Sequence, residues 1–142
     1  MIKTKTPLLK NTTNNLVQNA ESCLTQWCND LDEWPQSWAG DKDDVVTGLR
    51  LVSEFESYLL ELITKGRTKK TVKKHAYYLW ALGGEVIHDL NENGVEEKLS
   101  DRELLLNYVT SNGGPYWRHA QSRRDSEQFD SACRKLYKHL SH

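Results

Sequence analysis

Two long stretches of this chain carry apolar residues at helical spacing, and only a short turn separates them. Apolar residues recur at intervals of three and four over 45–62, and again over 72–90. Between the two stretches, Gly66 suits the end of one helix and Thr68 suits the N-cap of the next. The pattern therefore predicts two long helices in succession, each with one buried face.

The spacing also assigns the buried face of each helix. For the first helix, the expected buried positions are Val45, Leu49, Val52, Phe55 or Glu56, Leu59 and Leu62. For the second, they are Val72, Ala76, Leu79, Trp80, Gly83, Val86, Ile87 and Leu90.

Asp43 and Asp44 fall in the first turn of the first helix, where negative charge suits the helix dipole. The pair Gly83-Gly84 costs about 1 kcal/mol per glycine relative to alanine, so we expect another helix to approach closely there, or a kink.

The N-terminal third shows weaker patterns. Residues 1–12 are expected to form a loose arm, and 14–30 a helix. Pro35 and Gly40 break regular structure, which predicts a loop over 32–44. We expect the tryptophans of this loop to pin it to the core, because large aromatic side chains bury much apolar surface.

The C-terminal third predicts two more helices. Ser100 and Glu103 have the spacing of a capping box, which opens a short helix that is expected to end near Thr110. The last helix is expected to begin at Ser122 or Asp125 and to end near Leu140. Its expected buried positions are Phe129, Ala132, Cys133, Leu136 and Leu140. No strand-like alternation longer than a few residues occurs, so the sequence predicts an all-α protein of about five helices. We expect 1–44 to comprise an arm, an extra helix and the tryptophan-containing loop, and 45–142 to form one compact helical domain.

Positive charge is concentrated in one short segment. The chain has a net charge of -1, yet residues 65–75 contain no acid, and the flanking segments 41–64 and 76–101 are acidic. The basic residues of 65–75 are Lys65, Arg67, Lys69, Lys70, Lys73 and Lys74. On a helix that begins at Thr68, the last four and Tyr77 fall opposite the apolar face. The segment is therefore expected to form a rigid basic surface.

Such a surface suits the phosphates of nucleic acid, because lysine and arginine neutralise phosphates and release counterions. Hydroxyl groups near a helix N-terminus can add hydrogen bonds to phosphate. The predicted DNA-binding residues are Lys65, Arg67, Thr68, Lys69, Lys70, Thr71, Lys73, Lys74 and Tyr77. Two alternatives stay open, a solvated helix face and a surface for an acidic protein partner. A helix-turn-helix, which places a recognition helix after a short helix and turn, is a further alternative.

The order of these parts resembles the N-terminal core-binding domain, a SAM-like module, of the tyrosine recombinases or phage integrases. The stretches that carry the resemblance are LVSEFESYLLELITKG, RTKKTVKKHAYYLWALGGEVI, KLSDRELLLNYV and SEQFDSACRKLYKHL, which cover about residues 45–140. The resemblance implies an orthogonal helical bundle of that type, here with an extra N-terminal helix. It also implies that the module clamps duplex DNA, to which the basic second helix contributes. The His-x-x-Arg motif of the family's catalytic domain does not occur in this sequence.

The sequence therefore predicts a non-catalytic, cytoplasmic module that binds double-stranded DNA and is related to mobile-element integrases. The alternative is a helical interaction or scaffold protein that has kept the fold without DNA binding, and self-association stays open. No enzyme motif, cofactor site or membrane segment is predicted. Cys23, Cys28 and Cys133 lack paired spacing and are expected to be core thiols, with no metal. The basic residues nearer the C-terminus could extend the basic surface, but they are interspersed with acids, which favours a solvated face. These residues are Arg118, Arg123, Arg124, Arg134, Lys135 and Lys138.

Overall fold

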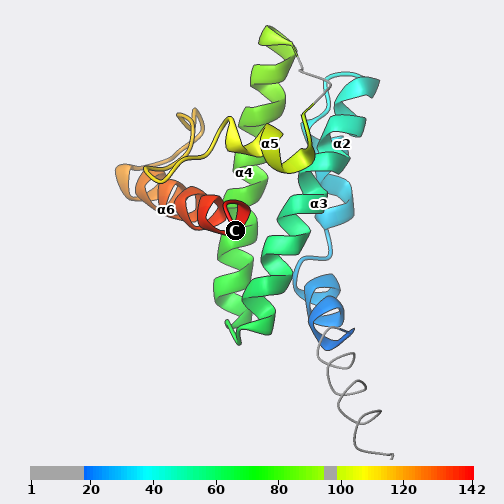
Figure 1. The fold of residues 1–142 in the computed structure, drawn as a ribbon, viewed down its shortest axis with the longest axis vertical. Coiled ribbons are helices and arrows are strands. Elements are labelled where there is room, and N and C mark those ends of the chain that lie inside the picture. The colour runs from blue at the N-terminus through cyan, green and yellow to red at the C-terminus, as the bar shows by residue number, and fades with distance from the viewer. Residues whose placement is uncertain (1–17, 95–98) are drawn as a thin grey trace, which may run out of the picture.

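A computed structural model describes residues 18–94 and 99–142 and shows an all-α protein, as predicted (Figure 1). After helical residues 18–27, the elements are η2 (Leu31–Glu33), α2 (Trp34–Trp38), α3 (Lys42–Thr64), α4 (Lys69–Asn93), α5 (Asp101–Leu106) and α6 (Arg123–Leu140). In the part of the chain that the structure describes, the one β feature is an isolated bridge between Thr110 and Gly113. Within the same ranges, no helix is both long and apolar enough to cross a membrane.

Helices α3 and α4 lie side by side and are joined by a tight turn (Figure 1). The turn is a Schellman motif, in which Gly66 has a φ of +85° and the Arg67 amide donates to the Leu62 carbonyl oxygen at 3.0 Å. The Thr68 hydroxyl caps α4 by accepting from the Thr71 amide at 3.2 Å. Both predicted boundaries are confirmed. The side-by-side packing differs from a helix-turn-helix, whose helices cross at a large angle.

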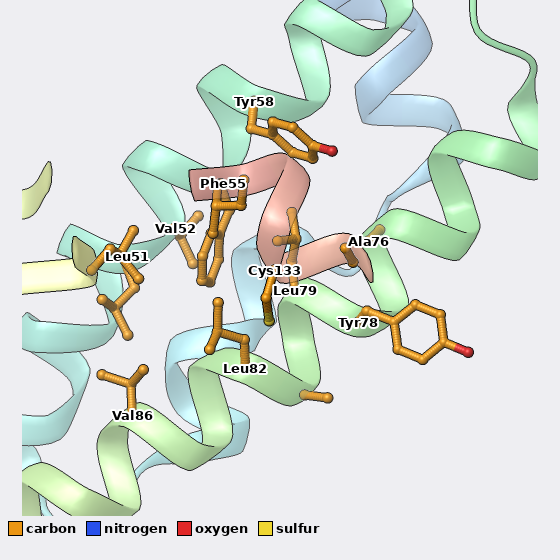
Figure 2. Close-up of a cluster of buried hydrophobic side chains, with 14 of the residues drawn as sticks. Leu51, Val52, Phe55, Tyr58, Ala76, Tyr78, Leu79, Leu82, Val86 and Cys133 are labelled. Atoms are coloured by element: carbon orange, nitrogen blue, oxygen red, sulfur yellow. The ribbon is translucent and has the colours of Figure 1, made fainter. Parts of the chain in front are cut away.

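The core lies where α3, α4 and α6 meet, and α6 crosses α4 steeply (Figures 1 and 2). Fully buried side chains of this core are Leu51, Phe55 and Leu59 from α3, Val72, Leu79, Leu82 and Ile87 from α4, and Phe129, Cys133, Leu136 and Leu140 from α6. The predicted faces of α4 and α6 are therefore largely confirmed. The Ser100 capping box of α5 is confirmed, but α5 ends at Leu106, before the predicted end near Thr110. Of the two starts considered for α6, the structure shows the one after Ser122.

The predicted face of α3 is partly wrong, because the helix is covered from two sides. Leu49 is 58% exposed and Val45 is only half-buried. The buried face instead includes Gly48, where an added Cβ would lie 2.9 Å from the Cα of Pro35. Helix α2 thus packs directly on the α3 backbone, and this contact turns the buried face away from Leu49.

The predicted loop over 32–44 is also wrong, because much of it is helical. It contains most of η2, all of α2 and the first turn of α3. The Trp38 indole lies against Gly83 so closely that any Cβ there would overlap the ring. Close approach of another helix, one of the two explanations considered for Gly83-Gly84, is thus the observed one.

Trp80 departs from its predicted burial and remains 40% exposed. Its indole Nε1 donates to the Ser37 hydroxyl at 3.0 Å, and its carbonyl oxygen accepts from Trp38 Nε1 at 3.0 Å. These two bonds fix α2 to the surface of α4. Trp80 therefore serves as an anchor at the surface rather than as a core residue.

The described residues test only part of the predictions for the N-terminal third. Residues 18–27 are helical and residues 28–30 form a turn, so the helix ends before the predicted residue 30. The arm predicted over 1–12 lies outside the described residues. Helix α3 begins at Lys42, ahead of the predicted domain start at 45.

Candidate nucleic-acid interface

The predicted DNA-binding residues lie together at the turn between α3 and α4 and along the first turns of α4. Lys65, Arg67 and Thr68 belong to the turn, and all three are exposed. The other predicted residues follow on α4, where Thr71 is half-buried and the remaining side chains are exposed. The α4 residues concerned are Lys69, Lys70, Thr71, Lys73, Lys74 and Tyr77. The local rules of helix capping and amphipathic spacing are sufficient to place this group.

Two of the turn residues are partly occupied by local contacts. The Lys65 ammonium lies 2.7 Å from a carboxylate oxygen of Glu61, one helical turn earlier. The Thr68 hydroxyl donates to the Thr71 hydroxyl at 3.1 Å while capping the helix. Lys65 and Thr68 are therefore less available to an incoming phosphate than the α4 lysines.

The basic ridge consists of Lys69, Lys70, Lys73 and Lys74. Among residues 18–94 and 99–142, no carboxylate oxygen lies within 4.0 Å of these four ammonium groups. Lysines that are exposed and close in sequence repel one another in the absence of an anion. The ridge therefore carries positive charge that no ion pair among the described residues offsets.

On one side, the ridge meets an acidic neighbour. Lys73 lines a cleft of about 330 Å³ together with Asp30, Trp27 and Trp34. The Asp30 carboxylate accepts from the Trp34 indole at 3.2 Å and so is held in place. A phosphate on this side would meet Asp30 as well as Lys73, and the positive surface ends here.

On the other side, the ridge continues onto α6. Lys74 and Lys135 line the same cleft of about 170 Å³, the α4–α6 cleft. Its remaining lining residues, none of them acidic, are Thr71, His75, Tyr78, Gln128, Ser131 and Ala132. The predicted DNA-binding set did not include Lys135, because the acids between the C-terminal basic residues favoured a solvated face. The packing of α6 on α4 brings Lys135 into the same cleft as Lys74.

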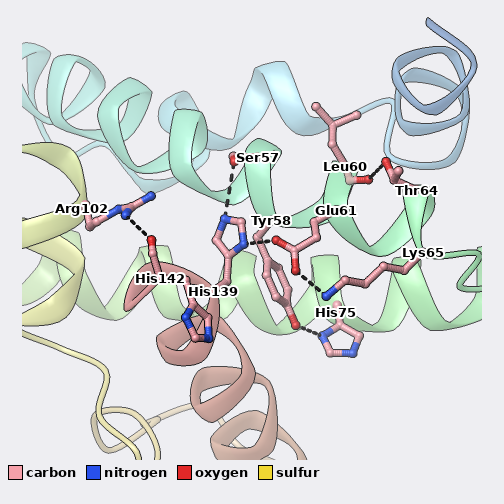
Figure 3. A network of polar contacts seen from close by, with 10 residues as sticks. All are labelled: Ser57, Tyr58, Leu60, Glu61, Thr64, Lys65, His75, Arg102, His139 and His142. Carbon is pink, nitrogen blue, oxygen red and sulfur yellow. Dashed lines mark hydrogen bonds and ion pairs between the residues drawn. The ribbon is translucent and has the colours of Figure 1, made fainter. Parts of the chain in front are cut away.

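His75 lies in the α4–α6 cleft and is buried. The Tyr58 hydroxyl and His75 Nδ1 are 3.1 Å apart (Figure 3). Burial lowers the pKa of His75 to about 4, with further lowering by the charges of Lys135, Lys74 and Arg67. The imidazole is therefore neutral at pH 7, and the positive charge of this cleft comes from the lysines.

A larger cleft of about 500 Å³ lies further along α4. Aromatic rings form much of its wall, from Tyr77 and Trp80 on α4, Trp38 on α2 and Trp117 in the segment before α6. The Arg118 guanidinium lies 3.1 Å from the Glu85 carboxylate at one edge. This volume is within the range of sites for small organic ligands.

One polar network has the order of groups found in serine hydrolases. His139 Nε2 lies 3.4 Å from the Ser57 hydroxyl, and Nδ1 contacts the Glu61 carboxylate (Figure 3). Acyl transfer also needs hydrogen-bond donors aimed at the developing oxyanion. The backbone amides around Ser57 lie inside α3 and bond to helix carbonyls, and Glu61 also pairs with Lys65. We therefore interpret the network as a structural contact that fixes the end of α6 to α3.

The cysteines contribute to packing. Cys28 and Cys133 are buried and Cys23 is half-buried, and none forms a disulfide. Burial raises the pKa of the Cys133 thiol well above its ordinary value, which makes it unreactive. Within the described ranges, no three histidine, cysteine or acidic side chains gather as metal ligands would.

Comparison of the chain with models of protein families, with curated proteins and with solved structures found no match. The resemblance to integrase core-binding domains therefore stays a prediction from the sequence, and the function is inferred from the chain's own geometry.

Proposed function

We propose that this chain is a non-catalytic module that binds double-stranded DNA through phosphate contacts. The basic ridge of α4 and Lys135 of α6 form the phosphate-binding surface, with Arg67 at the turn. The observation that carries the proposal is the set of four exposed lysines on one rigid helix, with no carboxylate in ion-pair distance among the described residues. A helix holds such charges at fixed spacing, which suits a regular array of phosphates.

Two features support duplex DNA with little sequence preference. Lysine ammonium groups contact phosphates, which carry no direct base information. The sequence also resembles a family module that clamps duplex DNA, and mobile-element biology follows from that resemblance alone. The acidic boundary at Asp30 favours an approach of the duplex from the α6 side of the ridge.

The test is a titration against a labelled duplex of random sequence at about 50 and 200 mM salt. Phosphate binding weakens steeply with salt, and its logarithmic slope is about -0.9 per neutralised phosphate. Replacement of all four ridge lysines by alanine should abolish binding while α4 persists, because alanine favours helix. Lack of binding of the unaltered protein at low salt would overturn the proposal.

A matched pair of single variants sharpens this test. Lys70→Ala removes a ridge charge, whereas Lys65→Ala removes a charge that already pairs with Glu61. We expect Lys70→Ala to weaken duplex binding more. Lys42→Ala, in the acidic first turn of α3 at the far end of that helix, should leave binding unchanged.

The second candidate is a protein-interaction or scaffold module. Val46 and Leu49 support it, because they are 63% and 58% exposed near the start of α3. The two side chains are three residues apart on α3 and offer exposed apolar surface that a partner would bury. If duplex binding is absent and Leu49→Lys abolishes self-association or partner binding, this candidate replaces the first.

A further inference from the structure

Two aromatic side chains of α4 remain exposed although large apolar surfaces are normally buried. Tyr77 is 45% exposed and Trp80 is 40% exposed. Their rings are near parallel, inclined by 26° with centroids 6.5 Å apart. Contacts hold both rings in place, because Trp80 bonds to Ser37 and Tyr77 packs edge-on against Trp117 at 6.0 Å. Together they present two near-parallel, partly exposed rings that are held in place, the Tyr77–Trp80 platform.

Each cleft that Tyr77 lines contains one cationic and one acidic side chain. The pairs are Lys73 with Asp30, Arg118 with Glu85, and Arg124 with Asp125. Arg118 forms an ion pair with its acid, whereas Lys73 has no carboxylate oxygen within 4.0 Å among the described residues. Lys73 precedes Tyr77 by four residues, which is about 6 Å along the helix axis. A lysine contact to a phosphate and a ring contact to the base of the same or the next nucleotide are compatible with this spacing.

We propose that the Tyr77–Trp80 platform stacks on an unpaired nucleobase of single-stranded DNA whose phosphates are held by the neighbouring cations. The proposal rests on the proposed function, because it uses the same basic ridge. It adds that the preferred ligand contains an unpaired segment beside the duplex. Proteins that bind single strands combine a basic surface with exposed aromatic rings in this way, since every base offers a flat face.

The large aromatic cleft is the place where such a base would lie. Its volume of about 500 Å³ accommodates a base with part of its sugar. Trp117 and Trp38 extend the aromatic wall beyond the platform, and Gln121 and Asn91 supply polar groups at its rim. Paired bases inside a duplex are already stacked and hydrogen-bonded, so the cleft would select bases that are unpaired.

The experiment compares oligonucleotides that have the same phosphates and differ in their bases. A labelled strand of about twelve thymidines is titrated by fluorescence anisotropy beside an abasic strand of equal length and a duplex. We expect the thymidine strand to bind about tenfold or more tightly than the abasic strand, in line with the effect of one stacked base. Both strands and the duplex should lose affinity when the ridge lysines are replaced.

Variants of the platform separate stacking from phosphate contact. Tyr77→Leu and Trp80→Leu should each weaken binding of the thymidine strand about tenfold and affect binding of the abasic strand and the duplex far less. Tyr77→Phe, which keeps the ring, should keep the preference for the thymidine strand. Tyr116→Leu, which removes an 83% exposed ring elsewhere, should bind like the unaltered protein. Thermal unfolding identifies any variant that fails to fold. If Trp80→Leu fails to fold, Tyr77→Leu alone still tests the proposal.

The outcomes are distinguishable. Equal binding of thymidine and abasic strands, with duplex binding intact, overturns the stacking proposal and leaves the proposed function standing. Absence of binding to every oligonucleotide overturns both. Tighter binding of the thymidine strand that survives Tyr77→Leu and Trp80→Leu places the stacked base elsewhere and also overturns the proposal.

Discussion

Lys74 of α4 and Lys135 of α6 line the same cleft, although they are far apart in the sequence. The cleft therefore joins the basic ridge to a second helix and gives the proposed phosphate surface a breadth that α4 alone lacks. We expect Lys135→Ala to weaken duplex binding about as much as Lys74→Ala and to lower the logarithmic salt slope by about 0.9. Anisotropy titrations over a series of salt concentrations measure both quantities.

Arg123 provides the control for this prediction. It lies at the start of the same helix, is exposed, and pairs with Glu127 at 3.2 Å. Arg123→Ala removes one positive charge from α6 away from the shared cleft. If it weakens binding as much as Lys135→Ala, net charge rather than the cleft determines affinity.

His75 should make stability depend on pH between about 6.5 and 4. Its pKa is about 4 in the folded protein and 6.5 for an ordinary histidine, mainly because of burial. Protonation therefore favours the unfolded chain, so the contribution is complete above pH 6.5 and declines as the pH falls toward 4. The full loss is about 3 kcal/mol. Denaturant titrations at several pH values measure it.

His75→Gln is the matched variant, since it keeps an acceptor for the Tyr58 hydroxyl without an imidazole. Other titrating groups affect both proteins equally, so the difference between their two stability curves reports His75. Parallel curves for the variant and the unaltered protein between pH 6.5 and 4 would contradict the prediction.

The two adjacent glycines of α4 should respond in opposite directions to alanine. A Cβ at Gly83 would overlap the Trp38 indole, so Gly83→Ala should lower the free energy of unfolding by about 1–3 kcal/mol. A Cβ at Gly84 would lie 3.6 Å from Trp38 Cδ1, which is an ordinary contact. Gly84→Ala should therefore raise the free energy by up to about 1 kcal/mol through helix propensity. Urea unfolding distinguishes the two signs.

Asp44 should be important for the start of α3. Its buried carboxylate accepts from the Gly40 amide at 2.7 Å and from the Asp41 amide and the Asn91 side chain at 3.1 Å. Burial acts to raise the pKa of Asp44, but these bonds prevail and lower it. The stabilisation is thus present above the ordinary pKa of 3.8 and is lost as the pH falls through the lowered value.

Asp44→Asn should lower the free energy of unfolding by about 1–3 kcal/mol, because the amide cannot accept all three bonds. Asp43→Asn changes an exposed carboxylate in the same turn and should cost less than about 1 kcal/mol. Thermal unfolding at pH 7 compares them. Equal losses would show that the helix dipole, rather than the buried bonds, accounts for the effect.

Much of the fold follows from rules that act over a few residues. The Gly66 turn, the Thr68 cap and the Ser100 capping box each depend on hydrogen bonds between residues at most five apart, so the sequence predicts them. The apolar spacing of α4 and α6 likewise predicts most of their buried faces. The exposed position of the ridge lysines follows from the same periodicity.

Other features depend on which elements pack against each other, and the local rules do not predict them. Helix α2 covers Gly48 and Gly83, which leaves Leu49 and Trp80 exposed although the spacing predicts their burial. The steep crossing of α6 over α4 brings Lys135 beside Lys74 (Figure 1). Helical periodicity defines the faces of a helix, but packing between distant segments determines which face is buried and which charges become neighbours. Local periodicity therefore defines the basic helix, whereas packing between distant elements sets its acidic limit at Asp30, its extension to Lys135 and its exposed aromatic platform.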